Sequence, residues 1–261
     1  PQTRELIQLC DVGGRMGAQN RGAAIARPLE PAIEPTDTAI AGFTMHFMES
    51  WLPLSLLNFD PRQGQFRERS GFRFNDGTAV AAAFDLFGLL AALERHHIAI
   101  GDISGKNILV DPKSGKPGLI DMDSVHFEDW ESDSRGTPGY VDPHVFDSDL
   151  NAVGGYHFDS KSDVFAMTVV AFSLLVGVMP FYFGTHPPLN TKEEFARKRL
   201  SSFRVAVEGE GCLARFGLRL ADPDTIAFVK ERMTEIKRVK GTSGQDGELL
   251  VDHFADVFIR D

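Results

Sequence analysis

The apolar residues of this chain are gathered in blocks that are separated by polar, glycine-rich and proline-rich stretches. Within residues 78–96, apolar side chains recur at the spacing of one face of an α-helix. These positions are Val80, Phe84, Phe87 and Ala91. Asn75 or Asp76 precedes them and is suited to cap the helix, because its side chain can accept a hydrogen bond from a free backbone N–H. The pattern predicts an amphipathic helix over 78–96.

The block from Val164 to Met179 is apolar on every side, which is typical of a helix buried at the centre of a fold. It contains Thr168 and Ser173 and is shorter than the roughly 20 residues that a bilayer requires. We therefore expect a central core helix here rather than a membrane span. The helix over 78–96 is expected to pack against it.

The remaining pattern places strands before the core helices. Residues 1–12 have a helical pattern, and residues 25–33 and 41–50 are predicted strands joined by a turn at 34–38. Further amphipathic helices are predicted near 191–204, 221–237 and 248–259. The sequence thus predicts an α+β protein, with a small strand-bearing portion over 1–50 and a mostly helical portion over 51–261. A hinge near Met48 to Pro53 would divide the two.

Three short motifs carry the candidate chemistry: IAIGDISGKNILV at 98–110, LIDMDS at 119–124 and GTPGY at 136–140. In the first, Asn107 follows Asp102 by five residues, and Asp121 comes after a predicted hairpin whose turn lies at 112–116. One carboxylate is suited to face an incoming hydroxyl group, while an amide oxygen and a second carboxylate are suited to hold Mg²⁺. The motifs together indicate a metal–nucleotide site.

Composition narrows the range of functions. The chain has 261 residues, 43% of them hydrophobic, and is therefore expected to bury a substantial core. Its net charge is −10 and no dense cluster of Lys and Arg occurs, so nucleic acid and anionic membranes are not expected partners. The two cysteines, Cys10 and Cys212, are most simply reduced thiols of a cytoplasmic protein, although one long-range disulfide stays open.

The ordered motifs resemble those of the protein kinase-like superfamily. The stretch 98–110 is similar to the catalytic loop, and 136–144 is similar to the end of the activation segment. The stretch 161–181 is similar to the central helix of the family. The resemblance runs from the helix before the fourth strand of the N-lobe to the end of the C-lobe. It implies a protein kinase-like fold with a partial N-lobe and a mostly helical C-lobe.

The resemblance also implies roles for single residues. Asp102 would accept the proton of the attacking hydroxyl, and Lys106 would neutralise charge on the transferred phosphoryl group. Thr137 would hydrogen-bond to Asp102, which favours Ser/Thr over Tyr as acceptor. Asp163 would cap the backbone of the catalytic loop.

The same resemblance places the cofactor. Asn107 and Asp121 would bind Mg²⁺, and Asp123, which stands where the family has glycine, would bind a second metal ion or an incoming group. Met45 is the candidate gatekeeper. The segment His46, Phe47 and Met48 would face the adenine of ATP.

Several positions depart from the family pattern. Ile100 and Gly101 stand where His and Arg usually precede the catalytic aspartate, so activation by phosphorylation is not expected. His144 replaces a structural glutamate, so the ion pair that anchors the activation segment is expected to differ. The glycine at 101 and the aspartate at 123 also resemble those of aminoglycoside and choline kinases and of some divergent, bacterial-type Ser/Thr protein kinases.

The N-terminal part lacks two features of the family. The first lysine is Lys106, so residues 1–105 do not supply the lysine of the third strand, and the stretch GGRMG at 13–17 is interpreted as a loop rather than a phosphate cradle. Because the chain begins with Pro1, we expect the missing strands to lie upstream, with Glu5 as a partner for the lysine. If they do not exist, the protein is a pseudokinase or uses a substitute.

Three functional classes follow. The leading one is an ATP- and Mg²⁺-dependent Ser/Thr protein kinase acting on protein substrates, favoured by the long segment from Asp121 to His144. The second is a kinase of a small hydroxyl compound, favoured by Asp123. The third is a non-catalytic pseudokinase scaffold. The oligomeric state does not follow from the sequence.

Overall fold

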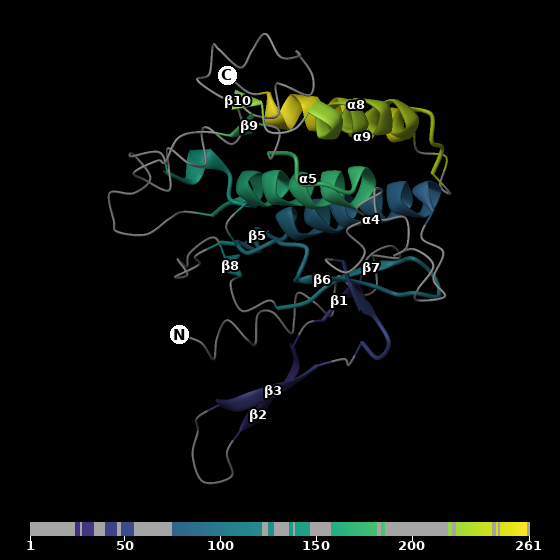
Figure 1. Cartoon of the computed structure of the whole chain (residues 1–261). Helices are drawn as coiled ribbons and strands as arrows, with labels where there is room; N and C mark the ends of the chain where they lie inside the picture. The colour runs from purple at the N-terminus through teal and green to yellow at the C-terminus, as the bar shows by residue number, and fades with distance from the viewer. Residues whose placement is uncertain are drawn as a thin grey trace.

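A computed structural model describes the helical core and most of the short strands. The described residues are 24–26, 28–33, 40–45, 48–54, 75–121, 125–127, 136–137, 139–146, 158–181, 184–185, 219–220, 223–241, 244 and 246–259. The predicted helices at 1–12 and 191–204 lie outside them, as do both cysteines. Within these residues, strands β1 to β8 lie toward one side and helices α4, α5, α8 and α9 toward the other, while β9 and β10 lie beside α8 and α9 (Figure 1).

Helix α5, Ser160–Val176, is the centre of the core, as the all-round apolar pattern predicts. Its first turn is fixed by a capping box, in which the Asp159 side chain accepts from the backbone N–H of Ser162 and the Ser162 side chain bonds back to the backbone of Asp159. Gly177 ends the helix in the left-handed conformation at φ 88°, which a residue with a Cβ adopts only with strain. The helix is therefore held at both ends as well as by its core packing.

Helix α4, Asp76–Glu94, packs against α5, as expected. Asn75 is its N-cap, and Asn75 Oδ1 accepts a hydrogen bond from the backbone N–H of Thr78 at 2.9 Å. The predicted apolar stripe is only partly right, because Ala91 is exposed. The face that is buried carries these residues: Ala79, Val80, Ala82, Ala83, Leu86, Leu89, Leu90, Ala92 and Leu93. The helix is apolar on several sides, so periodicity alone did not single out the face that meets α5.

By length and composition, α4 also satisfies the criterion for a helix that could cross a membrane. A single such helix is weak evidence of a span, because core helices of soluble domains meet the same criterion. Here its leucines belong to the same buried cluster as α5. The packing of α4 in the described residues is that of a core helix.

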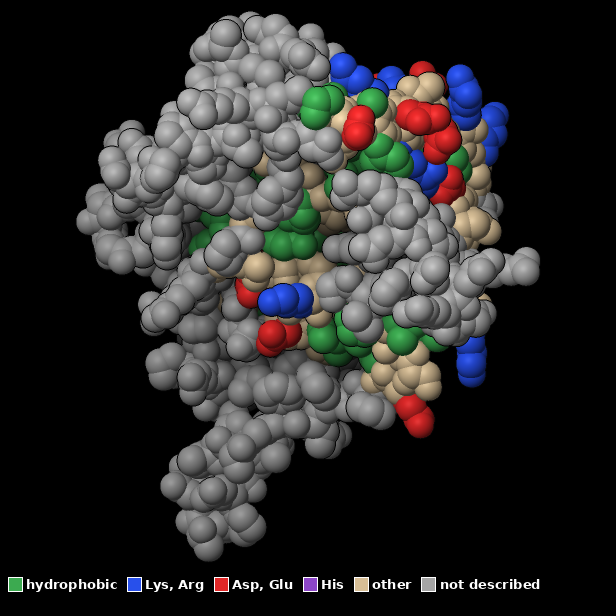
Figure 2. All heavy atoms as spheres, in the orientation of Figure 1, with side chains coloured by type: hydrophobic (Ala, Val, Ile, Leu, Met, Phe, Trp, Pro, Cys, Tyr) green, Lys and Arg blue, Asp and Glu red, His purple; other side chains and the backbone are tan. Residues whose placement is uncertain are grey.

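Helices α8, Pro223–Lys237, and α9, Gly247–Phe258, form the layer on the other side of α5 (Figure 1). They agree with the helices predicted near 221–237 and 248–259. Phe254 and Phe258 of α9 meet Phe172 of α5 in edge-to-face contacts, with ring centroids 5.3 and 6.1 Å apart. The outer surface over these two helices carries charges of both signs (Figure 2). Its exposed charged residues include Lys230, Glu231, Glu235, Lys237, Glu248 and Asp252.

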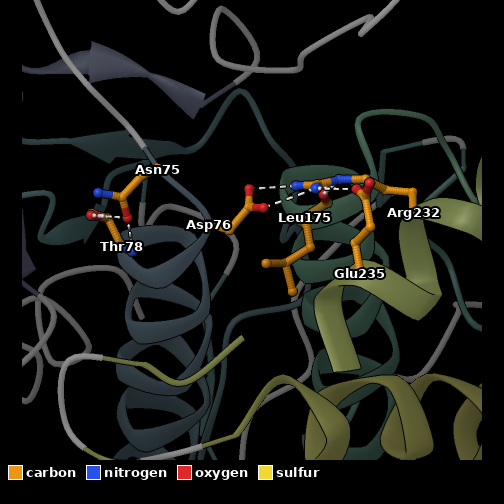
Figure 3. A network of polar contacts seen from close by, with 6 residues as sticks. All are labelled: Asn75, Asp76, Thr78, Leu175, Arg232 and Glu235. Carbon is orange, nitrogen blue, oxygen red and sulfur yellow. Dashed lines mark hydrogen bonds and ion pairs between the residues drawn. The ribbon is translucent and has the colours of Figure 1, made fainter. Parts of the chain in front are cut away.

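Arg232 joins the two helical layers (Figure 3). Its guanidinium binds both carboxylate oxygens of Asp76 at the start of α4, with Nη1 2.9 Å from Oδ2, and Nη1 also donates to Glu235. Nε donates to the carbonyl oxygen of Leu175 near the end of α5 at 3.1 Å. The Arg232 side chain is only 11% exposed. One cation thus connects three helices.

A four-stranded sheet lies on the far side of α4. Its strands, in the order β1-β7-β6-β4, are Ala24–Ile25, Pro117–Leu119, Ile108–Val110 and Leu52–Pro53. β6 and β7 form the predicted antiparallel hairpin, whereas β1 pairs with β7 in parallel. The turn between β6 and β7 is held by Asp111, which accepts from the backbone N–H of Lys113 and from the Ser114 hydroxyl.

The other strands form two-stranded pairs. They are β2, Pro28–Ile33, with β3, Ile40–Met45; β5, Ile98–Ala99, with β8, His126–Phe127; and β9, Gly184–Thr185, with β10, Arg219–Leu220. A 3₁₀ helix spans Pro143–Phe146. The predicted strands at 25–33 and 41–50 were too long: residues 24–25 form a separate strand, and residues 49–50 form a turn. The β2–β3 hairpin projects away from the helical layers (Figure 1).

Candidate active site

The loop after β5 is held from beneath by the central helix. Asp163, in the first turn of α5, accepts hydrogen bonds from the backbone N–H of Ile100 at 2.5 Å and of Gly101 at 2.9 Å. Gly101 has φ 80°, a conformation that suits glycine. The predicted cap of the loop by Asp163 is therefore present. It fixes the backbone immediately before Asp102.

Asp163 is almost fully buried, with 4% of its surface exposed. Burial raises its pKa to about 7, against the opposing effect of the two backbone hydrogen bonds, and the nearby charge of Asp159 raises it further. The group that anchors the loop therefore changes its charge near neutral pH.

Asp102 follows Gly101 in this loop and is half-buried. Thr137, 35 residues further along the chain, donates a hydrogen bond from Oγ1 to Asp102 Oδ1 at 2.6 Å. This is the contact that the sequence predicted. Among the described residues, the other oxygen, Oδ2, accepts no hydrogen bond. The contact orients the carboxylate and leaves Oδ2 available to a hydroxyl group.

Asn107 closes the loop and ties it to the β6–β7 hairpin. Its Nδ2 donates to the backbone oxygen of Asp102 at 2.9 Å, and its own carbonyl oxygen accepts from the backbone N–H of Ile120 at 2.9 Å. The second bond places Asn107 beside the end of β7, and Asp121 is the next residue after Ile120. The structure therefore brings together three predicted residues, Asp102, Asn107 and Asp121, at one end of the hairpin.

Two side chains beside this loop carry oxygen atoms of the kind that hard divalent cations take as ligands. Because Asn107 Nδ2 is committed to the backbone of Asp102, its Oδ1 remains as a possible oxygen ligand. Asp121 is exposed and has φ 60°, an uncommon conformation for a residue other than glycine. Carboxylate and amide oxygens are suitable ligands for Mg²⁺, which commonly takes only one or two carboxylates from the protein.

Of the other predicted site residues, the structure describes some and not others. Lys106 is exposed in the turn between Asp102 and Asn107. Met45 ends β3, but its side chain lies outside the described part, as do His46, Phe47 and Asp123 altogether. Met48 is described and half-buried, and it lies against Gly118 of the hairpin.

Comparison with known proteins found similarity to several kinases. No protein-family model matches the chain. The solved structure of the Cydia pomonella granulovirus kinase PK-1 is 16% identical, with a TM-score of 0.48, over 85% of this chain and 71% of that one. Among curated proteins, Serine/threonine-protein kinase 40 of Gallus gallus is 23% identical over 171 residues, which are 64% of this chain and 38% of that protein. The Putative wall-associated receptor kinase-like 13 of Arabidopsis thaliana is 27% identical over 150 residues, 51% of this chain and 18% of that protein.

The kinase motifs of the sequence, the hydrogen bonds that join them and the kinase relatives agree. The chain has a protein kinase-like fold. It spans less than half the length of these two curated relatives. The kinase-like fold accounts for the central place of α5, which supports the candidate catalytic loop through Asp163.

His144, which stands where the family has a structural glutamate, contacts two carboxylates. His144 Nδ1 lies 2.9 Å from Asp142 Oδ2, and His144 Nε2 lies 3.5 Å from Asp159 Oδ1. At that length and geometry Nε2 makes no hydrogen bond, so we regard the contact with Asp142 as the stronger one. The imidazole thus lies between the segment and the N-cap of α5.

One part of the site was not foreseen. The indole of Trp51 and the Met48 side chain lie over Gly118, on the hairpin that carries Asn107 and leads to Asp121. A signal existed in the sequence, because a bulky aromatic residue follows the predicted hinge and a glycine interrupts an otherwise apolar strand. The pairing itself, between residues far apart in the chain, has no local signature.

Proposed function

We propose that this chain is the catalytic portion of an ATP- and Mg²⁺-dependent protein kinase that phosphorylates Ser or Thr hydroxyl groups. The observation that supports this best is the hydrogen bond from Thr137 to Asp102. It couples the segment from Asp121 to His144, where a protein substrate would lie, to the candidate base. Kinase relatives support the phosphotransferase class.

In this proposal each residue of the candidate site has a separate role in phosphate transfer. Asp102 Oδ2 takes the proton of the substrate hydroxyl as its oxygen attacks the γ-phosphorus of ATP, and ADP leaves. Thr137 keeps Asp102 oriented, and Lys106 would neutralise charge on the transferred group. Asn107 Oδ1 and Asp121 would hold Mg²⁺, which supplies charge stabilisation to the phosphates when bound.

The test is a substitution of the base. Asp102→Asn is expected to lower the rate of phosphate transfer from ATP to casein or to Ser/Thr peptides by about 100-fold or more, since general-base catalysis contributes about 10²–10⁴-fold. Binding of Mg²⁺-ATP, measured by equilibrium dialysis, should change little. Thr137→Val should also lower the rate, and Thr137→Ser should restore most of it, because serine keeps the hydroxyl donor.

The matched control is Asp252→Asn, which makes the same chemical change at an exposed aspartate on α9. Equal rates for the original chain and Asp102→Asn would contradict the proposal. Transfer to small alcohols but to no protein would favour the small-molecule kinase instead.

A pseudokinase is the second candidate, because residues 1–105 contain no lysine to pair with the nucleotide phosphates. In that case Mg²⁺-ATP would bind without any transfer, and Asp102→Asn would change neither property. The same assays distinguish the two candidates.

A further inference from the structure

Two faces of the β6–β7 hairpin have different surroundings. Ile108, Val110 and Leu119 point to one face and belong to the buried core. Because side chains alternate along a strand, the opposite face carries Leu109 and Gly118, which are direct partners in the ladder. This second face is the one on which Trp51 and Met48 lie.

The second face leads to Asn107, one of the candidate metal ligands. Asn107 precedes Leu109 by two residues, and Ile120 follows Gly118 by two, so both share the face at the end of the hairpin. At about 3.3 Å per residue, Gly118 lies roughly 10 Å along the strand from Asp121. A nucleotide with its phosphates at Asn107 and Asp121 would therefore extend its base along this face, toward Leu109 and the indole that covers Gly118.

Trp51 can lie on this face only because residue 118 is glycine. A Cβ atom built on Gly118 would be 2.6 Å from Cζ3 of Trp51, closer than carbon atoms approach, and 3.2 Å from Cε of Met48, a tight contact. The indole therefore rests directly on the backbone of β7. Trp51 itself is only half-buried, so part of its surface remains available to a ligand.

We propose that Trp51 is a specificity-determining residue of the nucleotide site, whose indole forms the surface on which the purine base stacks. This inference rests on the proposed function. Flat aromatic surfaces stack on any base, with an effect of about 5- to 150-fold in affinity. Trp51 would thus raise the affinity for nucleotides relative to phosphates that carry no base. Because stacking makes few contacts with the edge of the base, the affinities for ATP and GTP would rise by similar factors.

The first measurement is fluorescence in a Trp130→Phe background, in which Trp51 is the only tryptophan left of the two in the chain. Titration with Mg²⁺-ATP is expected to quench the emission, because the base contacts the indole. Mg²⁺-tripolyphosphate, which has no base, should leave the emission nearly unchanged. Equal emission with and without saturating Mg²⁺-ATP would overturn the proposal.

The second measurement separates base binding from phosphate binding. In equilibrium dialysis, Trp51→Ala should raise the Kd for Mg²⁺-ATP about tenfold or more and leave the Kd for Mg²⁺-tripolyphosphate unchanged, whereas Trp51→Phe should retain most of the affinity. Gly118→Ala, which displaces the indole without removing it, should weaken ATP binding as well. Asp121→Asn, by contrast, should weaken both ligands.

The outcomes distinguish this inference from the proposed function. If Mg²⁺-ATP binds and Trp51→Ala has the original Kd, Trp51 is a packing residue and the kinase proposal stands. If the unaltered chain binds no Mg²⁺-ATP, both proposals fail. Thermal unfolding of each variant without ligand shows whether it is folded. If both Trp51→Ala and Trp51→Phe are folded and neither binds Mg²⁺-ATP, that result would also contradict stacking.

Discussion

At the scale of single residues, the candidate site depends on one buried carboxylate that lies beneath the loop carrying Asp102. Asp163 holds the backbone at Ile100 and Gly101, and so positions Asp102 indirectly. Its burial raises its pKa to about 7. The carboxyl group that holds the loop is therefore expected to change its charge near neutral pH.

This shift predicts a pH-dependent stability. Because the pKa is higher in the folded chain than its ordinary value of 3.8, the contribution of Asp163 is fully present below about pH 4 and is lost as pH rises to about 7. The free energy of unfolding should fall by up to about 1.4 kcal/mol per pH unit in that window. Asp163→Asn should remove this slope. It should also destabilise the fold by about 2 kcal/mol near pH 4, because its amide group turns a donor toward a backbone N–H. This difference should shrink as pH rises to about 7, where the unaltered chain has lost the contribution of Asp163.

Urea unfolding at a series of pH values measures both effects. Asp252→Asn, on the exposed side of α9, is the control and should keep the slope of the unaltered chain. Parallel pH profiles for Asp163→Asn and the unaltered chain would show that Asp163 does not titrate in this range.

At the scale of elements, the local sequence pattern predicted single helices and the hairpin, but it did not predict contacts between residues that lie far apart in the chain. The hairpin of β6 and β7 followed from its turn, and α5 followed from its uniform apolarity. The pairing of β1 with β7 involves only two residues of β1 and partners far away in the chain, so no local signal marks it. Arg232 is likewise separated from Asp76 by 156 residues.

The Arg232 contact predicts a measurable coupling between α4 and α8. In a double-mutant cycle with Asp76→Ala and Arg232→Ala, we expect a coupling energy of about 1–3 kcal/mol, since the pair is bidentate and Arg232 is largely buried. The control pair is Lys237 and Asp252, which joins α8 to α9 at the surface at 3.0 Å. Its coupling should be about 0.5 kcal/mol or less, because both side chains are exposed.

Urea unfolding of the six single and double variants measures the two couplings. Similar values for the two pairs would indicate that Arg232 acts mainly through its bond to Leu175 and through packing.

At the scale of the whole molecule, the motifs predicted the fold better than they predicted the nucleotide site. The bond from Thr137 to Asp102 joins two predicted residues, because family spacing relates them. Met45, His46, Phe47 and Asp123 stay predictions, since the described part does not include their side chains. The contact of Trp51 with Gly118 depends on three strands lying together, which only tertiary structure reveals.

A folded nucleotide site should stabilise the chain as a whole. Mg²⁺ and ATP together, at about 100 times Kd, are expected to add about 2.7 kcal/mol to the free energy of unfolding and to raise the Tm by several degrees. Neither ligand alone should have this effect, and Asp121→Asn should abolish it. Differential scanning fluorimetry with Asp252→Asn as control checks this, and an equal shift in Asp121→Asn would exclude Asp121 as a ligand.

The β6–β7 hairpin has one further consequence, which concerns insertions and deletions. Its turn, at Pro112 to Lys116, lies at the opposite end from Asn107 and Asp121. Extra residues in the turn would lengthen only a surface loop, at small entropic cost. Deleting one residue from β6 would instead exchange its two faces, turning Leu109 into the core and Ile108 out of it. The turn is thus the place for an affinity tag or a fluorescent label, while the strands beside it tolerate no change in length.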